Sequence, residues 1–166
     1  MNTIELFTDG ACIGNPGPGG YGAIVVTSSG TRELSGGFRK TTNNRMEMMG
    51  PLVALRALAS PTRGVLWTDS LYVVNAIEKR WAIGWRKKSW MRTPSERASN
   101  SDLWAEMLTL LEPHEIRFRW VKGHAGHPEN ERCDELANTA ARGRELAIDA
   151  GYEQPSHAPR ATLFDG

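Results

Sequence analysis

The sequence predicts a single α/β domain with a mixed sheet, in which three antiparallel strands come first and later strands are added through helices. Three observations lead to this prediction. The 166 residues have the length of one ordinary domain. The periodic segments follow the order βββαβαβα, with one extra helix inserted. Short turns join the first three strands and make them antiparallel neighbours, whereas the later strands need right-handed crossovers.

The first forty residues predict the three antiparallel strands. Side chains alternate over residues 4–12, and a second and a third strand follow over 21–27 and 31–40. Residues 14–20, GNPGPGG, predict a loop because glycine and proline are poor residues for the interior of a helix or a strand. A turn at 28–30 joins the second strand to the third.

A helix is predicted over about residues 43–58, with Asn43 or Asn44 as its N-cap. Pro51 lies inside this helix, and we interpret it as a kink on an exposed side. The alternative is that the kink helps to aim Glu47. The apolar stripe of the helix consists of Met46, Met49, Val53 and Ala57, widened by Leu52 and Leu55.

The remaining elements alternate between strands and helices. We predict a strand over 64–68, a helix over 70–78, a basic tryptophan-rich stretch over 79–92, a polar loop over 93–101, a helix over 102–111, a strand over 115–121 and a helix that begins at Pro128. From about Gly151 the chain carries two prolines and no periodicity. We therefore expect one domain over residues 1–152 and a mobile C-terminal tail over 153–166.

The composition excludes several classes of protein. The net charge is only +1, so no global field marks a polyanion-binding protein. The start, MNTIELFTDG, carries an acid at Glu5 and no long apolar run, so we expect that it is not a signal peptide, and no stretch has the length of a membrane span. Cys12 and Cys133 cannot form a disulfide framework, so we expect free thiols in a reducing cytoplasm.

Four acidic residues stand in separate, motif-like settings: Asp9 in FTDG, Glu47 in NNRMEMM, Asp69 in WTDS and Asp134 in ERCDELA. Asp9 and Asp69 each end a strand in the order threonine, aspartate, small residue. If the two strands are neighbours, both carboxylates leave the same edge of the sheet. Carboxylates that meet repel one another unless a cation compensates them, and Mg²⁺ prefers carboxylate oxygens. The pattern therefore predicts a magnesium site built from distant acids.

Each acid taken alone also has an ordinary interpretation. Aspartates at strand ends are typical of turns and of helix N-caps. Glu47 fits a solvated position on a helix, and Asp134 fits the first turn of a helix, where it favourably meets the dipole. Spacing alone therefore supports the metal site only in part.

A zinc site at His124, His127 and Cys133 is the rival metal hypothesis. It is disfavoured because this spacing matches no standard structural zinc pattern and a fourth soft ligand is lacking nearby. His124 lies in the loop KGHAGHPEN, where a histidine can act as a proton carrier. The ordinary alternative is a solvated loop histidine.

The segment from Lys79 to Arg92 combines cations with tryptophans, and no acid interrupts it before Ser95. Trp81 and Trp85 are four residues apart and share a helix face. The pattern predicts a handle that binds the phosphate backbone without reading sequence. The alternative is that tryptophans anchor the segment to the body while the cations are solvated. The residues concerned are Lys79, Arg80, Arg86, Lys87, Lys88 and Arg92, with Trp81, Trp85 and Trp90 among them.

Four motifs in this order resemble type 1 bacterial ribonuclease H: FTDGACIGNPGPGGYGA, TTNNRMEMM, TDSLYV and WVKGHAGHPENERCDELA. The resemblance covers about residues 4–152. It implies a five-stranded mixed sheet flanked by helices, and an endonuclease that hydrolyses the RNA strand of RNA–DNA hybrids largely independently of sequence, leaving 5′-phosphate and 3′-hydroxyl ends. It further implies two divalent ions, normally Mg²⁺ with Mn²⁺ as a substitute, and a cytoplasmic monomer without a membrane partner.

Carried over by motif, the resemblance makes Asp9, Glu47, Asp69 and Asp134 metal ligands and, with His124, catalytic residues. It implies that Gly10, Cys12, Asn15, Asn43 and Asn44 line the minor groove, that Thr42 contacts a phosphate, and that Trp81, Trp85, Arg86, Lys87 and Lys88 form a basic protrusion that holds the DNA strand. The sequence departs from the family pattern at two places. Leu71 stands where many relatives carry glutamine, and Gly50-Pro51 replaces the usual helix-forming pair.

Two alternative functions belong to other classes. One is a non-catalytic protein that binds hybrids or double-stranded RNA. The presence of all four acids argues against it, because negative charge near phosphates gains a pure binder nothing. The other is a relative with the same fold, such as a Holliday-junction resolvase or a strand-transfer nuclease. The loop of glycine and asparagine and the tryptophan-rich handle favour the hybrid-cleaving enzyme instead.

Overall fold

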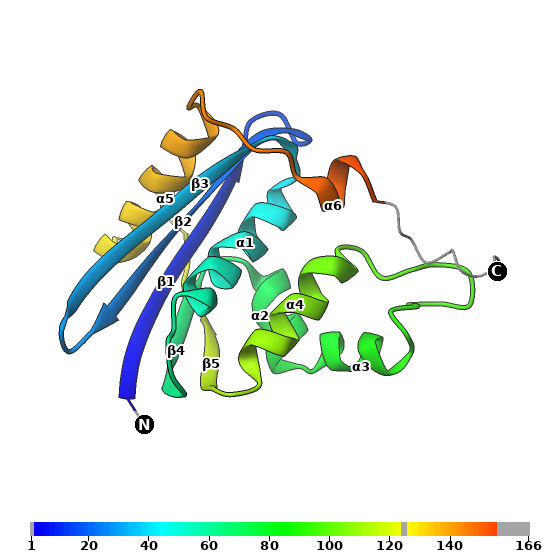
Figure 1. The fold of residues 1–166 in the computed structure, drawn as a ribbon, viewed down its shortest axis with the longest axis horizontal. Helices are drawn as coiled ribbons and strands as arrows, with labels where there is room; N and C mark the ends of the chain where they lie inside the picture. The colour runs from blue at the N-terminus through cyan, green and yellow to red at the C-terminus, as the bar shows by residue number, and fades with distance from the viewer. Residues whose placement is uncertain (1, 124–125, 156–166) are drawn as a thin grey trace.

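A computed structural model describes residues 2–123 and 126–155 of the chain. Its five-stranded sheet has the order β3-β2-β1-β4-β5 (Figure 1). The first three strands pair antiparallel, and the last two run parallel to β1, so the predicted mixed sheet is confirmed. The strands are β1 (Asn2–Cys12), β2 (Gly17–Thr27), β3 (Gly30–Thr41), β4 (Thr62–Thr68) and β5 (Glu115–Trp120).

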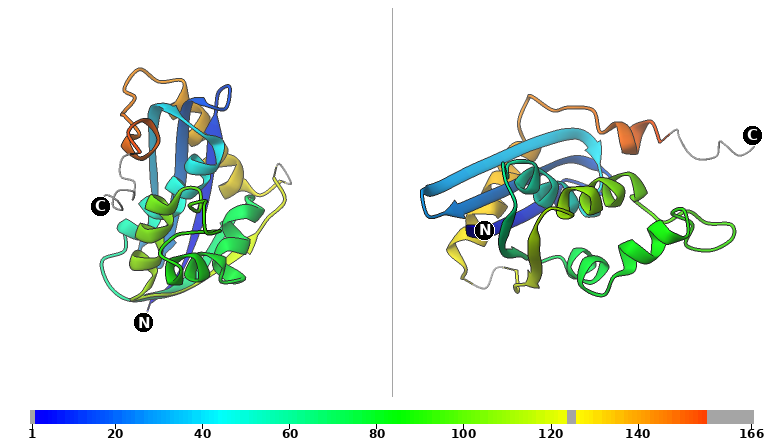
Figure 2. Two further views of the ribbon diagram at one scale, coloured as in Figure 1. Left: turned by 90° about the vertical axis from the view of Figure 1, so that its right-hand side faces the viewer. Right: turned by 60° about the horizontal axis from the view of Figure 1, so that its bottom comes forward.

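Helices cover both faces of the sheet. α5 lies across β2 and β1 on one face, while α1, α2 and α4 occupy the other, and α3 extends away from the sheet (Figures 1 and 2). The order of helices follows the prediction, with α3 inside the basic stretch. The helices are α1 (Asn43–Arg56), α2 (Leu71–Glu78), α3 (Trp81–Lys87), α4 (Ser101–Leu111), α5 (Pro128–Ala141) and α6 (Ala150–Glu153).

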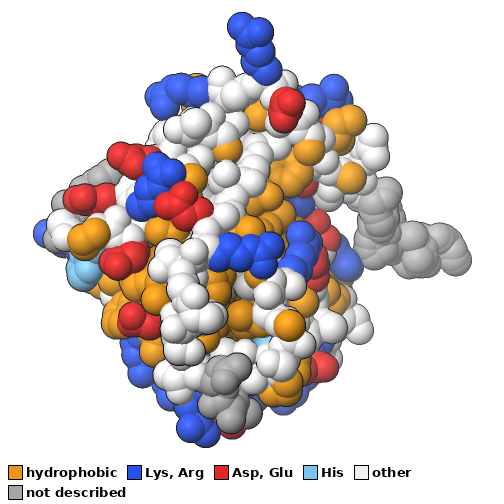
Figure 3. All heavy atoms as spheres, turned by 60° about the vertical axis from the view of Figure 1, so that its left-hand side comes forward, with side chains coloured by type: hydrophobic (Ala, Val, Ile, Leu, Met, Phe, Trp, Pro, Cys, Tyr) orange, Lys and Arg blue, Asp and Glu red, His pale blue; other side chains and the backbone are white. Residues whose placement is uncertain are grey.

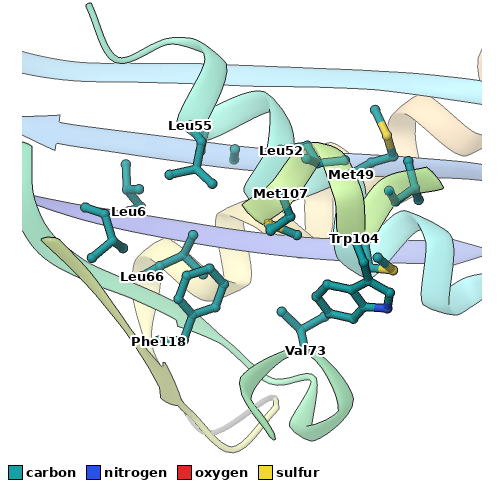
Figure 4. Packing of buried hydrophobic residues seen from close by; sticks show 14 of the residues in the cluster. Leu6, Met49, Leu52, Leu55, Leu66, Val73, Trp104, Met107 and Phe118 are labelled. Carbon is teal, nitrogen blue, oxygen red and sulfur yellow. The ribbon is translucent and has the colours of Figure 1, made fainter. Parts of the chain in front are cut away.

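The main core lies between the sheet and the layer of α1 and α4. Side chains from neighbouring strands meet side chains from both helices there, as Figure 4 shows for Leu6, Leu66, Phe118, Leu52, Leu55, Trp104 and Met107. Of the predicted stripe on α1, Val53 is only half-buried and Ala57 is the C-cap. α1 instead buries Met48 and Ala54 as well, because the sheet and α4 enclose it from two sides.

The prediction that residues 14–20 form a loop is wrong from Gly17 onward, because β2 begins there. The reason is close packing between α5 and the sheet. A Cβ atom on Gly20 would lie 2.3 Å from the carbonyl oxygen of Ala137 on α5. Glycine at this position therefore serves helix–sheet contact inside a strand, which the local sequence does not distinguish from a turn.

The start and the middle of α1 also differ from expectation. The N-cap is Thr42, whose hydroxyl accepts a hydrogen bond from the Arg45 N–H at 3.3 Å, and not Asn43 or Asn44. Pro51 is buried, so its interpretation as a kink on an exposed side is wrong. The departure at Gly50-Pro51 therefore lies on the side of α1 that packs inward.

The chain is ordered beyond the point where periodicity ends. α6 covers Ala150–Glu153, within the stretch expected to lack structure from Gly151 onward. Arg39 on β3 donates two hydrogen bonds to the Glu153 carboxylate, at 3.0 Å from Nε and 2.9 Å from Nη2. A tertiary ion pair therefore holds a segment whose local sequence shows no helical pattern.

The surface over α5 carries charges of both signs. Figure 3 brings this side forward and shows acidic and basic side chains interspersed on that face. Arg132 on α5, for example, pairs with Glu33 on β3. Within the described residues, no helix combines the length and the apolar character needed to cross a membrane.

Candidate active site

The predicted convergence of Asp9 and Asp69 follows from the pairing of two strands. β1 and β4 are parallel neighbours, with Phe7 opposite Trp67. Two residues further on, Asp9 lies inside β1, which continues to Cys12, and Asp69 directly follows β4. The expectation that Asp9 ends its strand is therefore wrong, because pairing with β2 extends β1, but the parallel register still brings the two carboxylates together.

Glu47 reaches this edge because α1 lies directly on β1. A Cβ atom on Gly10 would lie 2.4 Å from the Met46 carbonyl carbon and 2.5 Å from the Glu47 nitrogen, so only glycine permits this contact. One carboxylate oxygen from each of Asp9, Glu47 and Asp69 lies within 4.8 Å of the other two. The structure thus brings three of the four predicted metal ligands into one cluster.

Asp134 lies beside this cluster and not within it. It comes from α5 and lines a small cavity together with Asp9, Asp69, Gly123, Asn130 and Glu131. Its carboxylate accepts a hydrogen bond from the Asn138 side chain at 3.1 Å. Asp134 is therefore placed at the rim, where it faces the same cavity from the opposite helix layer.

The cluster is electrostatically unfavourable without a cation. Burial, followed by the nearby charge of Asp69, raises the pKa of Asp9 to about 8, although the Gly10 N–H donates a hydrogen bond to its carboxylate at 2.9 Å. Burial and the charge of Asp9 also raise the pKa of Glu47 well above its usual value. Oε1 of Glu47 and Oδ1 of Asp69 are buried without a hydrogen-bond partner in the described part of the chain.

These residues fit a hard divalent cation. Clustered carboxylates with unpaired oxygens are the ligands that Mg²⁺ and Mn²⁺ prefer, and a cation would remove their mutual repulsion. The rival zinc hypothesis is not supported for Cys133, which is fully buried and donates to the Phe7 carbonyl oxygen at 3.2 Å. Burial also raises the pKa of its thiol, which opposes the thiolate form that zinc binds.

The residues predicted to line the minor groove gather beside the carboxylates. Gly10 and Cys12 lie at the end of β1, and Asn43 and Asn44 begin α1. The Asn43 N–H donates to Oδ1 of Asn15 at 3.0 Å, which joins the loop after β1 to the start of α1. This bond links two of the predicted groove residues, and Thr42, the N-cap of α1, lies next to Asn43; we call this group of residues the polar surface.

The predicted handle is α3 and its flanking residues, where the two tryptophans differ. Trp85 is half-buried and packs against Trp104 with ring centroids 6.3 Å apart, as in the anchoring alternative. Trp81 is 42% exposed, and Nζ of Lys79 lies 5.7 Å from the centre of its ring. Lys87 and Lys88 are exposed. His124 lies outside the described residues.

Comparison with known proteins settles the family. Residues 1–142 match the family model described as RNase H. The chain belongs to the RNase H family. Curated members include a ribonuclease H of Aeromonas salmonicida strain A449, which is 55% identical over 92% of this chain and 99% of its own length. A ribonuclease HI of Synechocystis is 51% identical over 91% of this chain and 95% of its own length. This RNase H is therefore an enzyme.

Solved structures show the same RNase H fold. LC9-RNase H1, a type 1 RNase H with the type 2 active-site motif, superposes with a TM-score of 0.76 at 31% identity, over 98% of this chain and 84% of its own. LC11-RNase H1 in complex with an RNA/DNA hybrid superposes with a TM-score of 0.60 at 21% identity, over 90% of this chain and 99% of its own.

Three further residues of this RNase H line or border the site and were not singled out in the sequence. Asn130 lies one helical turn before Asp134, and its Oδ1 is buried without a partner in the described ranges. A Cβ atom on Gly123 would lie 2.7 Å from Oδ2 of Asp69. Trp120 donates from Nε1 to the Asp69 carbonyl oxygen at 3.1 Å. The four-residue spacing of Asn130 and Asp134 was the available signal.

The raised pKa values predict that the metal-free RNase H loses stability as the pH rises from about 4 to about 8. Asp9 has a pKa of about 8 in the folded chain and the ordinary aspartate pKa of about 4 in the unfolded chain. The folded state therefore binds more protons in this window, and the free energy of unfolding falls as pH rises, by at most about 1.4 kcal/mol per pH unit for each carboxyl group.

Urea unfolding followed by circular dichroism, in the presence of a chelator, measures this slope. Excess Mg²⁺ at pH 8 should restore the lost stability, because the cation replaces the protons. The Glu47→Gln variant serves as the control and should show a shallower slope. A flat profile for the metal-free chain would contradict the electrostatic description of the site.

Proposed function

We propose that this RNase H hydrolyses the RNA strand of RNA–DNA hybrids with two divalent cations, normally Mg²⁺, and largely without regard to sequence. The observation that carries the proposal is the cluster of Asp9, Glu47 and Asp69, with oxygens within 4.8 Å of one another. Asp134 would complete the ligand set from the rim. When bound, the cations would supply Lewis acidity that activates water and stabilises the leaving oxygen.

The protein contributes a rigid and nearly dry frame for this chemistry. Asp9 and Glu47 are each 8% exposed, so their carboxylates have few alternative orientations. The Gly10 N–H orients Asp9, and the backbone contact at Gly10 keeps Glu47 at its side. In the proposal His124 moves a proton or assists product release, and the products carry 5′-phosphate and 3′-hydroxyl ends.

Selection of RNA would come from the polar surface beside the cluster. The 2′-hydroxyl groups of RNA lie in the wide, shallow minor groove, where both donors and acceptors can contact them. The side-chain amides of Asn15, Asn43 and Asn44 offer both functions. Leu71, where the family resemblance implies glutamine, is 52% exposed two residues after Asp69, so it would offer the hybrid no polar contact there.

One cleavage assay separates this function from its alternatives. A labelled RNA–DNA hybrid, an RNA duplex, a DNA duplex and a four-way DNA junction are incubated with the protein, with and without Mg²⁺. We expect cleavage of the RNA strand of the hybrid with Mg²⁺ only. Binding without cleavage would indicate a non-catalytic protein, and cleavage of the junction would indicate a resolvase. Sedimentation of the purified protein tests the proposed monomer; the proposed cytoplasmic location rests on the family resemblance.

Salt dependence tests the handle. Each phosphate contact made by a cationic side chain releases counterions. Replacement of Lys87 and Lys88 by uncharged residues should therefore reduce the steepness of the plot of log binding constant against log salt concentration by about 1.5. Hybrid binding is measured by fluorescence anisotropy without metal, so that cleavage does not interfere. The control replaces two exposed arginines on the sheet, Arg32 and Arg63, by glutamine. An equal change of slope in both double variants would contradict a specific role of the handle.

A further inference from the structure

A buried ion-pair network joins the segment before α6 to the first turn of α1. The Arg45 guanidinium is 4% exposed and donates to Asp149 from Nε at 2.8 Å and from Nη2 at 2.9 Å. It also donates to Asp102 from Nη1 at 2.9 Å and from Nη2 at 2.8 Å, and to Oδ1 of Asn100 at 3.4 Å. All five N–H groups of the arginine therefore have acceptors.

Asp149 connects both sides of the segment that begins α1. The Thr41 hydroxyl, at the end of β3, donates to Oδ2 of Asp149 at 2.7 Å. Arg45 donates to the same carboxylate. Residues 42–44 therefore lie in the chain between Thr41 and Arg45, both of which are held by Asp149. Figure 1 shows the chain before α6 passing beside the start of α1.

The Asp102 side of the network reaches α2, which follows Asp69, and α3, which carries the handle. Asp102 lies in the first turn of α4, and the Asn100 side chain donates to the Tyr72 hydroxyl on α2 at 3.3 Å. Trp104 on α4 donates to the same hydroxyl at 3.0 Å and packs against Trp85 on α3. One guanidinium group is therefore connected to α1, α2, α3 and α4 through side-chain contacts.

The backbone of Gly151 covers the ion pairs. A Cβ atom at this residue would lie 2.0 Å from Oδ2 of Asp102 and 2.4 Å from Nη2 of Arg45. α6 is thus seated directly on the charged groups, and this contact leaves no room for a larger residue. The C-terminal segment is a structural part of the network and not merely adjacent to it.

Arg45 is buried and is held by two bidentate pairs, one with the buried Asp149 and one with the half-exposed Asp102, which fix the orientation of its guanidinium group. We propose that Arg45, held by Asp149 and Asp102, is a positioning residue that sets Asn43 and Asn44 relative to the handle and so determines affinity for the hybrid. This inference rests on the proposed function, because it assigns the start of α1 and the handle to the same substrate. Glu47 is held separately through the contact of α1 with Gly10, so the chemical step should depend less on the network.

The test compares the Asp149→Asn and Asp102→Asn variants of the full chain with Glu106→Gln. Glu106 is the matched control, because it pairs with Arg56 and joins the same two helices, α1 and α4, away from the site. We expect KM for the hybrid to rise about tenfold in both network variants, with kcat within about threefold of the parent chain. The control should keep KM within about twofold.

Affinity for the hybrid without metal, measured by anisotropy, should fall in parallel with the rise in KM. The inference is overturned if the network variants keep the KM and the affinity of the control, even where they unfold at a lower temperature. If Asp149→Asn does not fold, Asp102→Asn decides, since that carboxylate is 47% exposed. Failure of the parent chain to cleave the hybrid would count against the proposed function, while the affinities would still test the network.

Discussion

Replacement of Asp9 by asparagine should reduce hybrid cleavage by about a thousandfold or more, because it removes one ligand of the carboxylate cluster. Asparagine has nearly the same shape and retains an acceptor for the Gly10 N–H, so the fold should persist. The pKa of the Asp9 carboxyl group is raised to about 8, because burial opposes its charged form. The metal-free variant should therefore be at least as stable at pH 8 as the metal-free parent chain. Single-turnover kinetics measure the cleavage rate, anisotropy measures hybrid binding, and urea unfolding measures stability.

The control for this variant is Glu5→Gln on the same strand. Glu5 is exposed and accepts a hydrogen bond from Trp67 at 3.2 Å, far from the cluster, so its replacement should leave cleavage unchanged. If Asp9→Asn still cuts the hybrid at a rate close to that of the parent chain, the assignment of the site is wrong. If cleavage and hybrid binding are lost together, the effect of the variant is not confined to metal binding.

Replacement of Gly10 by alanine should damage both stability and activity. The added methyl group would lie 2.4 Å from the backbone carbonyl carbon of Met46. The backbones of β1 and α1 cannot rotate away from this clash as a side chain could. We expect a loss of about 3 kcal/mol in the free energy of unfolding, typical of severe overpacking. Because α1 must move away from β1, Glu47 would leave the cluster, and cleavage should fall by about a hundredfold.

The matched change for stability is Gly84→Ala on α3. Apart from its chain neighbours and the backbone of its own helix, no described atom lies within 4 Å of the position where its Cβ would be built. Alanine in a helix should therefore stabilise the chain by up to about 1 kcal/mol relative to glycine. Chemical unfolding of both variants gives the comparison. Equal stabilities for Gly10→Ala and the parent chain would show that α1 and β1 are not in the close contact described above.

Several features of the fold and the site could be predicted because they depend on neighbouring residues. Alternation and helical spacing placed the strands and helices near their observed bounds. The two threonine–aspartate motifs correctly predicted that Asp9 and Asp69 meet, since parallel neighbours in register bring equivalent residues together, although β1 continues past Asp9 to Cys12. The basic stretch was correctly separated from the sheet as an added element.

Other features could not be predicted, because each depends on a contact between distant residues. Local spacing left Glu47 indistinguishable from a solvated glutamate, and only the contact of α1 with Gly10 brings it to Asp9. The glycines that begin β2 resembled a loop until α5 was seen to pack on them. Pro51 looked exposed because its burial depends on the packing of α1 in the folded chain, which has no local signature.

The sequence by itself determined the type and order of the secondary-structure elements up to α5, the family and the identity of the acidic residues, because periodicity and motifs are properties of consecutive positions. Only the tertiary structure decided which acids share one cluster, which of them resist ionisation, and how Arg45 joins residues more than fifty positions away. The physical reason is that burial and electrostatic repulsion depend on distance in space. Folding, and not chain order, sets those distances.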